Sequence, residues 1–280
     1  MDSKKENHDK DAKRIRGIIL AGGSNTRLFP LTATTSKQLL PVYDRQMIFY
    51  PINVLVKAGV KDILIIVAPE HSGQFLNLLG SIFERFGVRI EFKVQKVPRG
   101  LADAFIMGED FIDEGNVIMV LGDNIFEDDL SEYIKKFKKG GMVFAKEVED
   151  DPRRYGIIEF DKEGVAVSIE EKPENPKSNF CVSGAYVFDN RVVGIAKHLK
   201  PSKRGEIEIT DINKAYLEMG ELHVEKLKGE WLDAGTFDSL LEAGRIVKEK
   251  GIYRKFDPLI DEAIGEFNKE LKEIVKKRLG

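Results

Sequence analysis

Short apolar runs that alternate with longer, helically patterned stretches constrain the fold of this chain more than any other feature. In its first half the apolar runs occupy residues 15–20, 63–67, 90–94, 117–121 and 142–145. The stretches 47–58 and 75–86 carry apolar residues at helical spacing. Strands that alternate with helices are typical of βαβ units, so we expect an α/β, Rossmann-like fold with a twisted, mostly parallel sheet.

The pattern changes after about residue 145. Strand-like segments rich in β-branched and aromatic residues then follow at close spacing, at 157–160, 165–169, 181–188 and 222–227. This spacing favours a smaller antiparallel or mixed lobe. No linker rich in Pro, Gly or Ser divides the chain, so we expect one continuous domain over 15–250, with halves of about 15–145 and 146–250.

The two ends of the chain differ from this body. Residues 1–14 are almost entirely polar, and we predict a disordered leader there. Residues 251–280 are predicted to be a C-terminal helical segment, because five apolar residues share one helical face. These residues are Ile260, Ile264, Phe267, Leu271 and Ile274. Two interpretations stay open: this face packs on its own subunit, or it forms a contact between subunits.

Composition excludes several classes of protein. The 280 residues include 44 Lys and Arg against 47 Asp and Glu, a balance that argues against a general nucleic-acid binder. The one cysteine, Cys181, permits no internal disulfide, and its apolar segment indicates a core residue. No apolar run reaches the roughly 18 residues of a membrane span, and no secretory signal is visible. We therefore expect a cytoplasmic protein with neither membrane nor nucleic-acid partners.

The first apolar run ends in a glycine turn that suits a phosphate ligand. Gly22 and Gly23 follow Leu20 and Ala21, and residues without side chains let backbone N–H groups approach a ligand. The spacing fits neither of the two common phosphate loops, G-x-x-x-x-G-K-[ST] and G-x-G-x-x-G. A glycine turn after a strand is also common as plain structure, so the turn alone leaves both interpretations open.

Three polar side chains beyond the turn favour the phosphate interpretation. Thr26 can donate a hydroxyl, and Arg27 carries a fork of donors that matches phosphate oxygens. Lys37 lies ten positions beyond Arg27, within the segment Ser-Lys-Gln-Leu-Leu-Pro-Val. A lone lysine is usually solvated surface, whereas two cations that flank a glycine turn would neutralise a triphosphate.

Six further blocks, in order along the chain, accompany the glycine turn. They are LLPVYD at 39–44, GLADA at 100–104, LGDN at 121–124, EEKP at 170–173, RGEIEITD at 204–211 and WLDAGT at 231–236. With them the chain resembles the sugar-phosphate nucleotidylyltransferases from about residue 17 to residue 247. The resemblance implies a GT-A-like nucleotidyltransferase fold whose first half binds the nucleotide and whose second half is the sugar-binding lobe.

Within this family the chain is most similar to the enzymes that use dTTP and glucose 1-phosphate. The resemblance implies Mg²⁺-dependent, in-line attack of the sugar phosphate on the α-phosphorus, which gives dTDP-glucose and pyrophosphate. It also implies a homo-oligomer, since family members are commonly tetramers. Use of UTP or another hexose 1-phosphate stays open, as does a non-catalytic sugar-nucleotide sensor. A glycosyltransferase would carry a D-x-D metal-binding motif at this strand end. It is disfavoured because Asp123 is followed by Asn124 and Ile125.

The resemblance assigns the reacting end of the nucleotide to a few residues. Arg27, Lys37 and Asp123 take the catalytic roles, and Asp123 and Asp233 are the metal ligands. Asp123 follows a buried apolar run, where a carboxylate can hold Mg²⁺. Judged without the resemblance, an Asp in a turn is more often a cap or turn former. Asn25 stands where the family loop usually has a further glycine.

Further substrate contacts are implied for the base and the loop. Leu20, Gly22, Gly23 and Thr26 belong to the loop that contacts the nucleotide. Gln95 matches the residue that reads the pyrimidine edge, and Gly100 leaves room for the ring. A Gln amide has both a donor and an acceptor, so it suits thymine and uracil equally.

The sugar contacts implied by the resemblance lie in the second half. Glu171 matches a residue that binds sugar hydroxyls, and Lys172 one that binds the sugar phosphate. Gly184 matches a backbone contact to the sugar, and Val182 lies in the same substrate-binding strand. Without the family, Glu–Lys neighbours are usually exposed surface, and Gly184 is equally a strand bulge.

Overall fold

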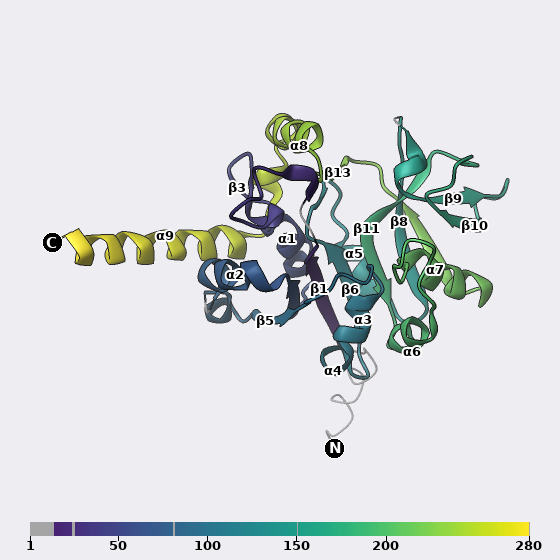
Figure 1. Cartoon of the computed structure of the whole chain (residues 1–280), viewed down its shortest axis with the longest axis horizontal. Coiled ribbons are helices and arrows are strands. Elements are labelled where there is room, and N and C mark those ends of the chain that lie inside the picture. Colours follow the sequence, from purple (N-terminus) through teal and green to yellow (C-terminus); the bar gives the residue numbers. More distant parts are fainter. Residues whose placement is uncertain (1–13, 24–25, 81, 150, 280) are drawn as a thin grey trace, which may run out of the picture. The chain divides into compact units, whose positions relative to one another are not determined.

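The computed structural model describes residues 14–23, 26–80, 82–149 and 151–279 (Figure 1). The predicted leader, apart from Arg14, lies outside these residues, and so does Asn25. The fold is α/β, as predicted, with a central mixed, mostly parallel sheet and two small antiparallel sheets. Within the described ranges no helix is both long and apolar enough to cross a membrane.

The chain forms two compact units that are interleaved along the sequence. Of the described residues, unit 1 comprises those within 14–16, 99–119 and 136–226, and unit 2 those within 17–98, 120–135 and 227–279. The sequence analysis divided the chain by predicted function, into halves of about 15–145 and 146–250, and that division stays a prediction. Two passages between the units, after residues 16 and 119, lie inside strands, where the apolar pattern is continuous and no composition shift marks a boundary.

Parallel strands form the core of unit 2. They are β1 (Ile15–Ala21), β4 (Asp62–Val67), β5 (Arg89–Val94) and the end of β6 (Asn116–Leu121). Ala21 lies opposite Val67, and Val67 opposite Val94, so the three carboxyl ends are level. All six residues of β4 are buried, as expected of a parallel strand covered on both faces. The predicted strands are confirmed here.

The remaining elements of unit 2 are helices, turns and two-stranded sheets. The helices are α1 (Phe49–Lys57), α2 (Ser72–Leu79), most of α5 (Ser131–Lys136), α8 (Phe237–Lys250) and α9 (Pro258–Leu279). The 3-10 turns are η1 (Thr26–Leu28), η2 (Lys37–Leu39), η3 (Pro69–His71), η4 (Phe83–Phe86) and η6 (Ile252–Lys255). The antiparallel pairs are β2 (Pro41–Val42) with β3 (Arg45–Gln46), and β7 (Asn124–Phe126) with β13 (Trp231–Asp233).

One predicted helix of unit 2 is wrong in its extent. The stretch 75–86 is not continuous, because α2 ends at Leu79 and η4 is a separate turn. Gly80 still donates its N–H to the carbonyl oxygen of Leu76 at 2.9 Å, but its ψ of −131° takes the chain out of the helix. Apolar spacing continues through this break, which is why the pattern concealed it.

Unit 1 contains the predicted mixed lobe. Its strands are β8 (Gly141–Glu147), β9 (Gly156–Phe160), β10 (Ala166–Glu171), β11 (Phe180–Phe188) and β12 (Leu222–Lys226). β10, β9, β11 and β8 pair antiparallel in that order, and β12 joins β8 in parallel. The helices and turn are α3 (Asp103–Met107), α4 (Glu109–Ile112), α6 (Arg191–His198), α7 (Ile209–Glu218) and η5 (Pro152–Arg154).

The core of unit 1 is aromatic. Phe188 stacks on Tyr216 with ring centroids 5.2 Å apart and meets Phe105 edge-on at 5.5 Å. Cys181 is fully buried in β11, and this burial raises the pKa of its thiol to about 12. The interpretation of Cys181 as a core residue is confirmed.

Candidate functional site

The carboxyl ends of the parallel strands in unit 2 bring the glycine turn and Gln95 together. Gln95 is buried, and its N–H donates to the carbonyl oxygen of Val67 at 2.9 Å. A Cβ on Gly22 would lie only 3.0 Å from the Gln95 side-chain oxygen, and Gly23 has a φ of 120° that favours glycine. Leu20 lies at the same edge, where its backbone carbonyl oxygen accepts a hydrogen bond from the Gly122 N–H at 3.0 Å. Open α/β sheets bind their ligands at this edge.

Arg27 and Asp233 approach the same point in unit 2. Thr26 and Arg27 lie in η1, which is anchored by the buried Leu28, and the Arg27 side chain is exposed. A Cβ on Gly235 would lie 2.9 Å from the Arg27 guanidinium and 3.0 Å from an Asp233 carboxylate oxygen. Because Gly235 has no side chain, it leaves space in which the Arg27 guanidinium and the Asp233 carboxylate can contact a ligand. The sequence assigned Gly235 no role.

Lys37 and Asp123 form an ion pair, although they are 86 positions apart. Their side chains are only 16% and 11% exposed. Burial tends to raise the pKa of Asp123, but the charge of Lys37 and hydrogen bonds from Lys37 and Asn124 outweigh it and lower the pKa. The carboxylate is therefore ionised at neutral pH, as a metal ligand must be.

Asn124 links both predicted metal ligands, a role that the sequence did not reveal. Its side-chain nitrogen donates to Asp123 at 3.0 Å, and its side-chain oxygen accepts the Trp231 indole N–H at 2.6 Å. In the pairing of β7 with β13, Asn124 lies opposite Asp233. Asn124 thus connects Asp123, in the turn before β7, with β13, the strand that carries Asp233.

The oxygen ligands of Asp123 and Asp233 fit a hard divalent cation. Mg²⁺ takes oxygen ligands and usually only one or two carboxylates from protein. Within the described residues no group of three or more His, Cys, Asp or Glu side chains is placed to hold a metal. A cation at this pair would therefore complete its coordination with water or substrate phosphate.

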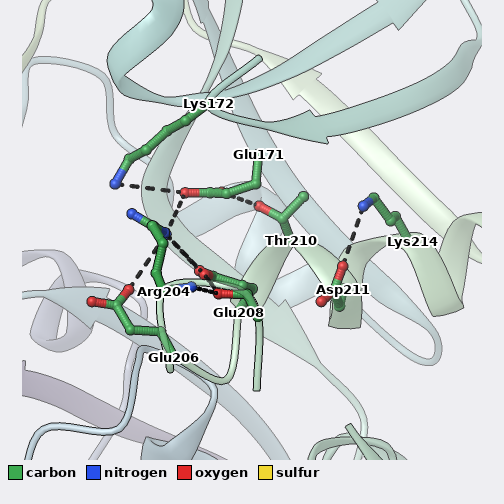
Figure 2. A network of polar contacts seen from close by, with 9 residues as sticks. Glu171, Lys172, Arg204, Glu206, Glu208, Thr210, Asp211 and Lys214 are labelled. Carbon is green, nitrogen blue, oxygen red and sulfur yellow. Dashed lines mark hydrogen bonds and ion pairs between the residues drawn. The ribbon is translucent and has the colours of Figure 1, made fainter. Parts of the chain in front are cut away.

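In unit 1, β10 ends at Glu171, and Lys172 follows it directly (Figure 2). Lys172 has a φ of 43°, its N–H donates to the carbonyl oxygen of Tyr155 at 3.0 Å, and its ammonium lies 3.7 Å from the Glu171 carboxylate. The buried Thr210 hydroxyl donates to the other Glu171 oxygen. Glu171 is thus fixed in orientation, whereas the Lys172 side chain is 43% exposed and open to a ligand.

Arg204 joins this cluster from a neighbouring loop, as Figure 2 shows. Its guanidinium lies 2.8 Å from Glu208, 3.3 Å from Glu171 and 3.4 Å from Glu206. Burial opposes the charge of Arg204, but the carboxylates outweigh it and raise its pKa. The sequence analysis gave Arg204 no role of its own. The glycine after it and the acidic residues that follow nevertheless indicate a charged loop.

The remaining substrate-binding residues predicted in unit 1, one for the base and two for the sugar, have clear structural positions. Gly100 has a φ of 103°, and a Cβ there would lie 2.7 Å from the Ile207 backbone nitrogen, so the loop of Arg204 packs directly against it. Val182 is buried and lies near Glu171, since a Cβ on Gly156 would contact both. The pairing of β11 with β8 shifts register between Val182 and Tyr186, which makes the Gly184 region a bulge.

The chain is similar to a known protein family and to enzymes of known activity. A family model described as nucleotidyl transferase matches residues 16–250. The glucose-1-phosphate thymidylyltransferase of Neisseria gonorrhoeae is 52% identical over 240 residues, which are 84% of this chain and 83% of that protein. The enzyme of that name from Mycolicibacterium smegmatis is 50% identical over 239 residues, 84% of this chain and 82% of that protein.

Two solved structures share the fold. A provisionally assigned glucose-1-phosphate thymidylyltransferase of Bacillus anthracis, in complex with sucrose, has a TM-score of 0.78 and 42% identity, over 83% of this chain and 94% of that one. A UDP-glucose pyrophosphorylase in complex with UDP-glucose has a TM-score of 0.73 and 25% identity, over 85% and 99%. The family match stops at residue 250, before η6 and α9.

Proposed function

Because the chain belongs to the nucleotidyl transferase family, we propose that it converts dTTP and α-D-glucose 1-phosphate into dTDP-glucose and pyrophosphate. Relatives about half identical over more than four fifths of both chains support this choice of substrates. The buried Lys37–Asp123 ion pair supports an active enzyme over a sensor. A protein that only binds the product has no need to hold a cation against a nearly buried carboxylate.

In the proposed reaction an oxygen of the sugar phosphate attacks the α-phosphorus of dTTP. The new P–O bond forms as the bond to the β-phosphate oxygen breaks, and pyrophosphate leaves with the electron pair. The attacking phosphate is ionised at neutral pH, so no general base is needed. Catalysis therefore depends on alignment and on neutralisation of charge, as in phosphoryl transfer generally.

The nucleotide is bound by residues of unit 2 in this proposal. Gly22 and Gly23 offer backbone N–H groups to the phosphates, with Leu20 and Thr26 beside them. Gln95 hydrogen-bonds the base. Arg27 contacts the triphosphate, and its exposed guanidinium supports this role. Removing one such donor typically slows a reaction by about 10²–10³.

Asp123 and Asp233 would hold the proposed Mg²⁺. When bound, the ion supplies positive charge at the phosphate oxygens. The Lys37 ammonium now pairs with the same carboxylate. Lys37 would keep Asp123 ionised before the substrate arrives, and with a cation held by Asp123 its ammonium would be free to neutralise phosphate charge.

The sugar phosphate is bound by residues of unit 1. Glu171 accepts hydrogen bonds from sugar hydroxyls, in the orientation that Thr210 imposes. Lys172 binds the sugar phosphate, while Val182 and the backbone at Gly184 contact the sugar ring. The 43% exposure of Lys172 supports its availability to an anion.

A second candidate differs only in the nucleotide. The Gln95 amide suits uracil as well as thymine, and the likeness to a UDP-glucose pyrophosphorylase favours UTP as the alternative. We further propose that the protein is a cytoplasmic homo-oligomer without nucleic-acid or membrane partners. Its near-neutral balance of 44 basic and 47 acidic residues supports the last point.

Pyrophosphate release tests the proposal. The protein is incubated with Mg²⁺, each of dTTP, UTP, ATP, CTP and GTP, and glucose, galactose or mannose 1-phosphate. Fastest release with dTTP and glucose 1-phosphate is expected. Release only with UTP would replace the first candidate by the second, and binding of dTDP-glucose without release would indicate a sensor.

A further inference from the structure

Two antiparallel strands of unit 2 place the one tryptophan of the chain beside the proposed metal ligands. In the pairing of β7 with β13, Asn124 lies opposite Asp233. Trp231 precedes Asp233 by two positions, so both side chains lie on one face of β13. Trp231 is therefore the diagonal neighbour of Asn124 across the pair, a separation that an aromatic side chain can span.

The hydrogen bonds of the Asn124 amide run in one direction. Its oxygen accepts the Trp231 indole N–H at 2.6 Å, and its nitrogen donates to Oδ1 of Asp123 at 3.0 Å. An indole N–H can only donate and an ionised carboxylate can only accept, so these two partners fit a single orientation of the amide. Because Asn124 is only 2% exposed, a turned amide would leave buried polar groups mismatched.

The two carboxylate oxygens of Asp123 have different partners. Oδ1 accepts from Asn124, whereas Oδ2 is paired with the Lys37 ammonium. A backbone hydrogen bond also ties this turn to the end of β13, because the Ala234 N–H donates to the Asp123 carbonyl oxygen at 3.0 Å. Asn124 therefore holds one carboxylate oxygen and leaves the other at the ion pair.

We propose that Trp231 is a positioning residue for the metal site: its indole N–H fixes the Asn124 amide, which holds Oδ1 of Asp123 and leaves Oδ2 for the divalent cation. This inference rests on the proposed function, in which Asp123 holds Mg²⁺. Hydrogen bonds in such a chain polarise one another, so the indole also strengthens the amide as a donor. Removing a partner that orients a ligating side chain typically weakens metal binding by about 10- to 100-fold.

Packing alone does not explain the contact between Trp231 and Asn124. Trp231 lies opposite the buried Phe126, and packing against that side chain requires a ring but no N–H. The indole nevertheless directs its one polar atom at the Asn124 amide. Trp231→Phe keeps an aromatic ring and removes the donor, which makes it the informative variant.

Because the chain has one tryptophan, its indole N–H can be observed alone. The full chain is labelled with ¹⁵N-tryptophan, and the single indole signal is recorded by proton–nitrogen NMR. We expect Asn124→Ala to shift this signal and to speed exchange of the indole proton with water by about tenfold or more, because the acceptor is lost. Equal exchange rates in the two proteins would overturn the hydrogen bond and with it the proposal.

Binding of Mn²⁺, which takes the same oxygen ligands as Mg²⁺, tests whether Trp231 acts through Asn124. The free ion is measured by electron paramagnetic resonance. Trp231→Phe and Asn124→Ala should each raise the dissociation constant by about tenfold or more, and the double variant should bind no more weakly than Asn124→Ala alone. Tyr50→Phe is the matched control: it also deletes an aromatic donor, to the Val42 carbonyl oxygen at 2.8 Å, and should leave Mn²⁺ affinity unchanged.

An isosteric replacement separates the lost donor from the smaller ring of phenylalanine. Benzothienylalanine has sulfur in place of the indole N–H, and its incorporation instead of tryptophan changes Trp231 alone. It should weaken Mn²⁺ binding as much as Trp231→Phe does. Fluorotryptophan, which keeps the N–H, should bind Mn²⁺ like the wild type.

The outcomes distinguish failure of this inference from failure of the proposed function. If the wild type binds Mn²⁺ and Trp231→Phe binds it equally well, the positioning role is overturned and the metal site stands. The same holds if the two single losses multiply in the double variant, since Trp231 would then act independently of Asn124. A wild type that binds no Mn²⁺ would overturn both the metal site and this inference.

Discussion

Replacing Lys37 by Met should destabilise the protein strongly, because it leaves the Asp123 carboxylate without its cation. The ammonium and the carboxylate form an ion pair whose side chains are only 16% and 11% exposed. Met has similar length and no charge, so the change removes the charge with little loss of packing. After it, the Asn124 side-chain amide still donates to Asp123 at 3.0 Å but brings no charge.

The size of the effect follows from this burial. Removing one partner of a buried ion pair costs about 3–5 kcal/mol, since the remaining charge stays desolvated. For a chain of this length about 1 kcal/mol lowers the thermal midpoint by roughly 2 °C, so the midpoint should fall by about 6–10 °C. Asp123→Asn added to Lys37→Met removes the stranded charge and should restore at least half of the loss.

Differential scanning calorimetry in EDTA at pH 7 measures the effect, because EDTA removes cations that could replace Lys37. Lys57→Met is the matched control: Lys57 pairs with Asp129 at 2.8 Å, but these side chains are 26% and 48% exposed. Surface pairs contribute about 0–1 kcal/mol. A loss for Lys37→Met no larger than for Lys57→Met, or no recovery in the double variant, would refute the argument.

Three further predictions concern pH and the proposed substrate contacts. The lowered pKa of Asp123 contributes stability that is complete well above the unfolded value near 3.8 and is lost as pH falls through the lower folded pKa. The gap in thermal midpoint between wild type and Lys37→Met should therefore narrow as pH falls below 3.8, and a gap that does not narrow contradicts this. Arg27→Ala should slow turnover by about 10²–10³ in a pyrophosphate assay, and a loss below about tenfold would remove Arg27 from the mechanism. Lys172→Ala should raise KM for glucose 1-phosphate more than KM for dTTP, whereas equal changes would contradict its assignment to the sugar phosphate.

Strand positions could be predicted from the sequence because burial determines the apolar pattern locally. The run 63–67 became β4, Asp62–Val67, and the glycine turn followed β1 where the pattern placed it. The break at Gly80 could not be seen, because apolar spacing continues across it.

The partners of the site residues could not be predicted, because they depend on tertiary structure. Lys37 meets Asp123 across 86 positions, and Asn124 meets Trp231 across 107. The resemblance named the carboxylates and the cations, but not which of them pair. The charged loop around Arg204 is visible in the sequence, but the contacts of Arg204 and Thr210 with Glu171 appear only once α7 and its loop pack against β10.

The fate of isotope in the sugar phosphate tests the central claim most directly. Glucose 1-phosphate with three ¹⁸O atoms at the non-ester positions is incubated with dTTP, Mg²⁺ and the protein, and the products are measured by mass spectrometry. Attack of the sugar phosphate on the α-phosphorus predicts dTDP-glucose that retains all three labelled oxygens and pyrophosphate that contains none. Label in pyrophosphate, or no dTDP-glucose, would contradict the account.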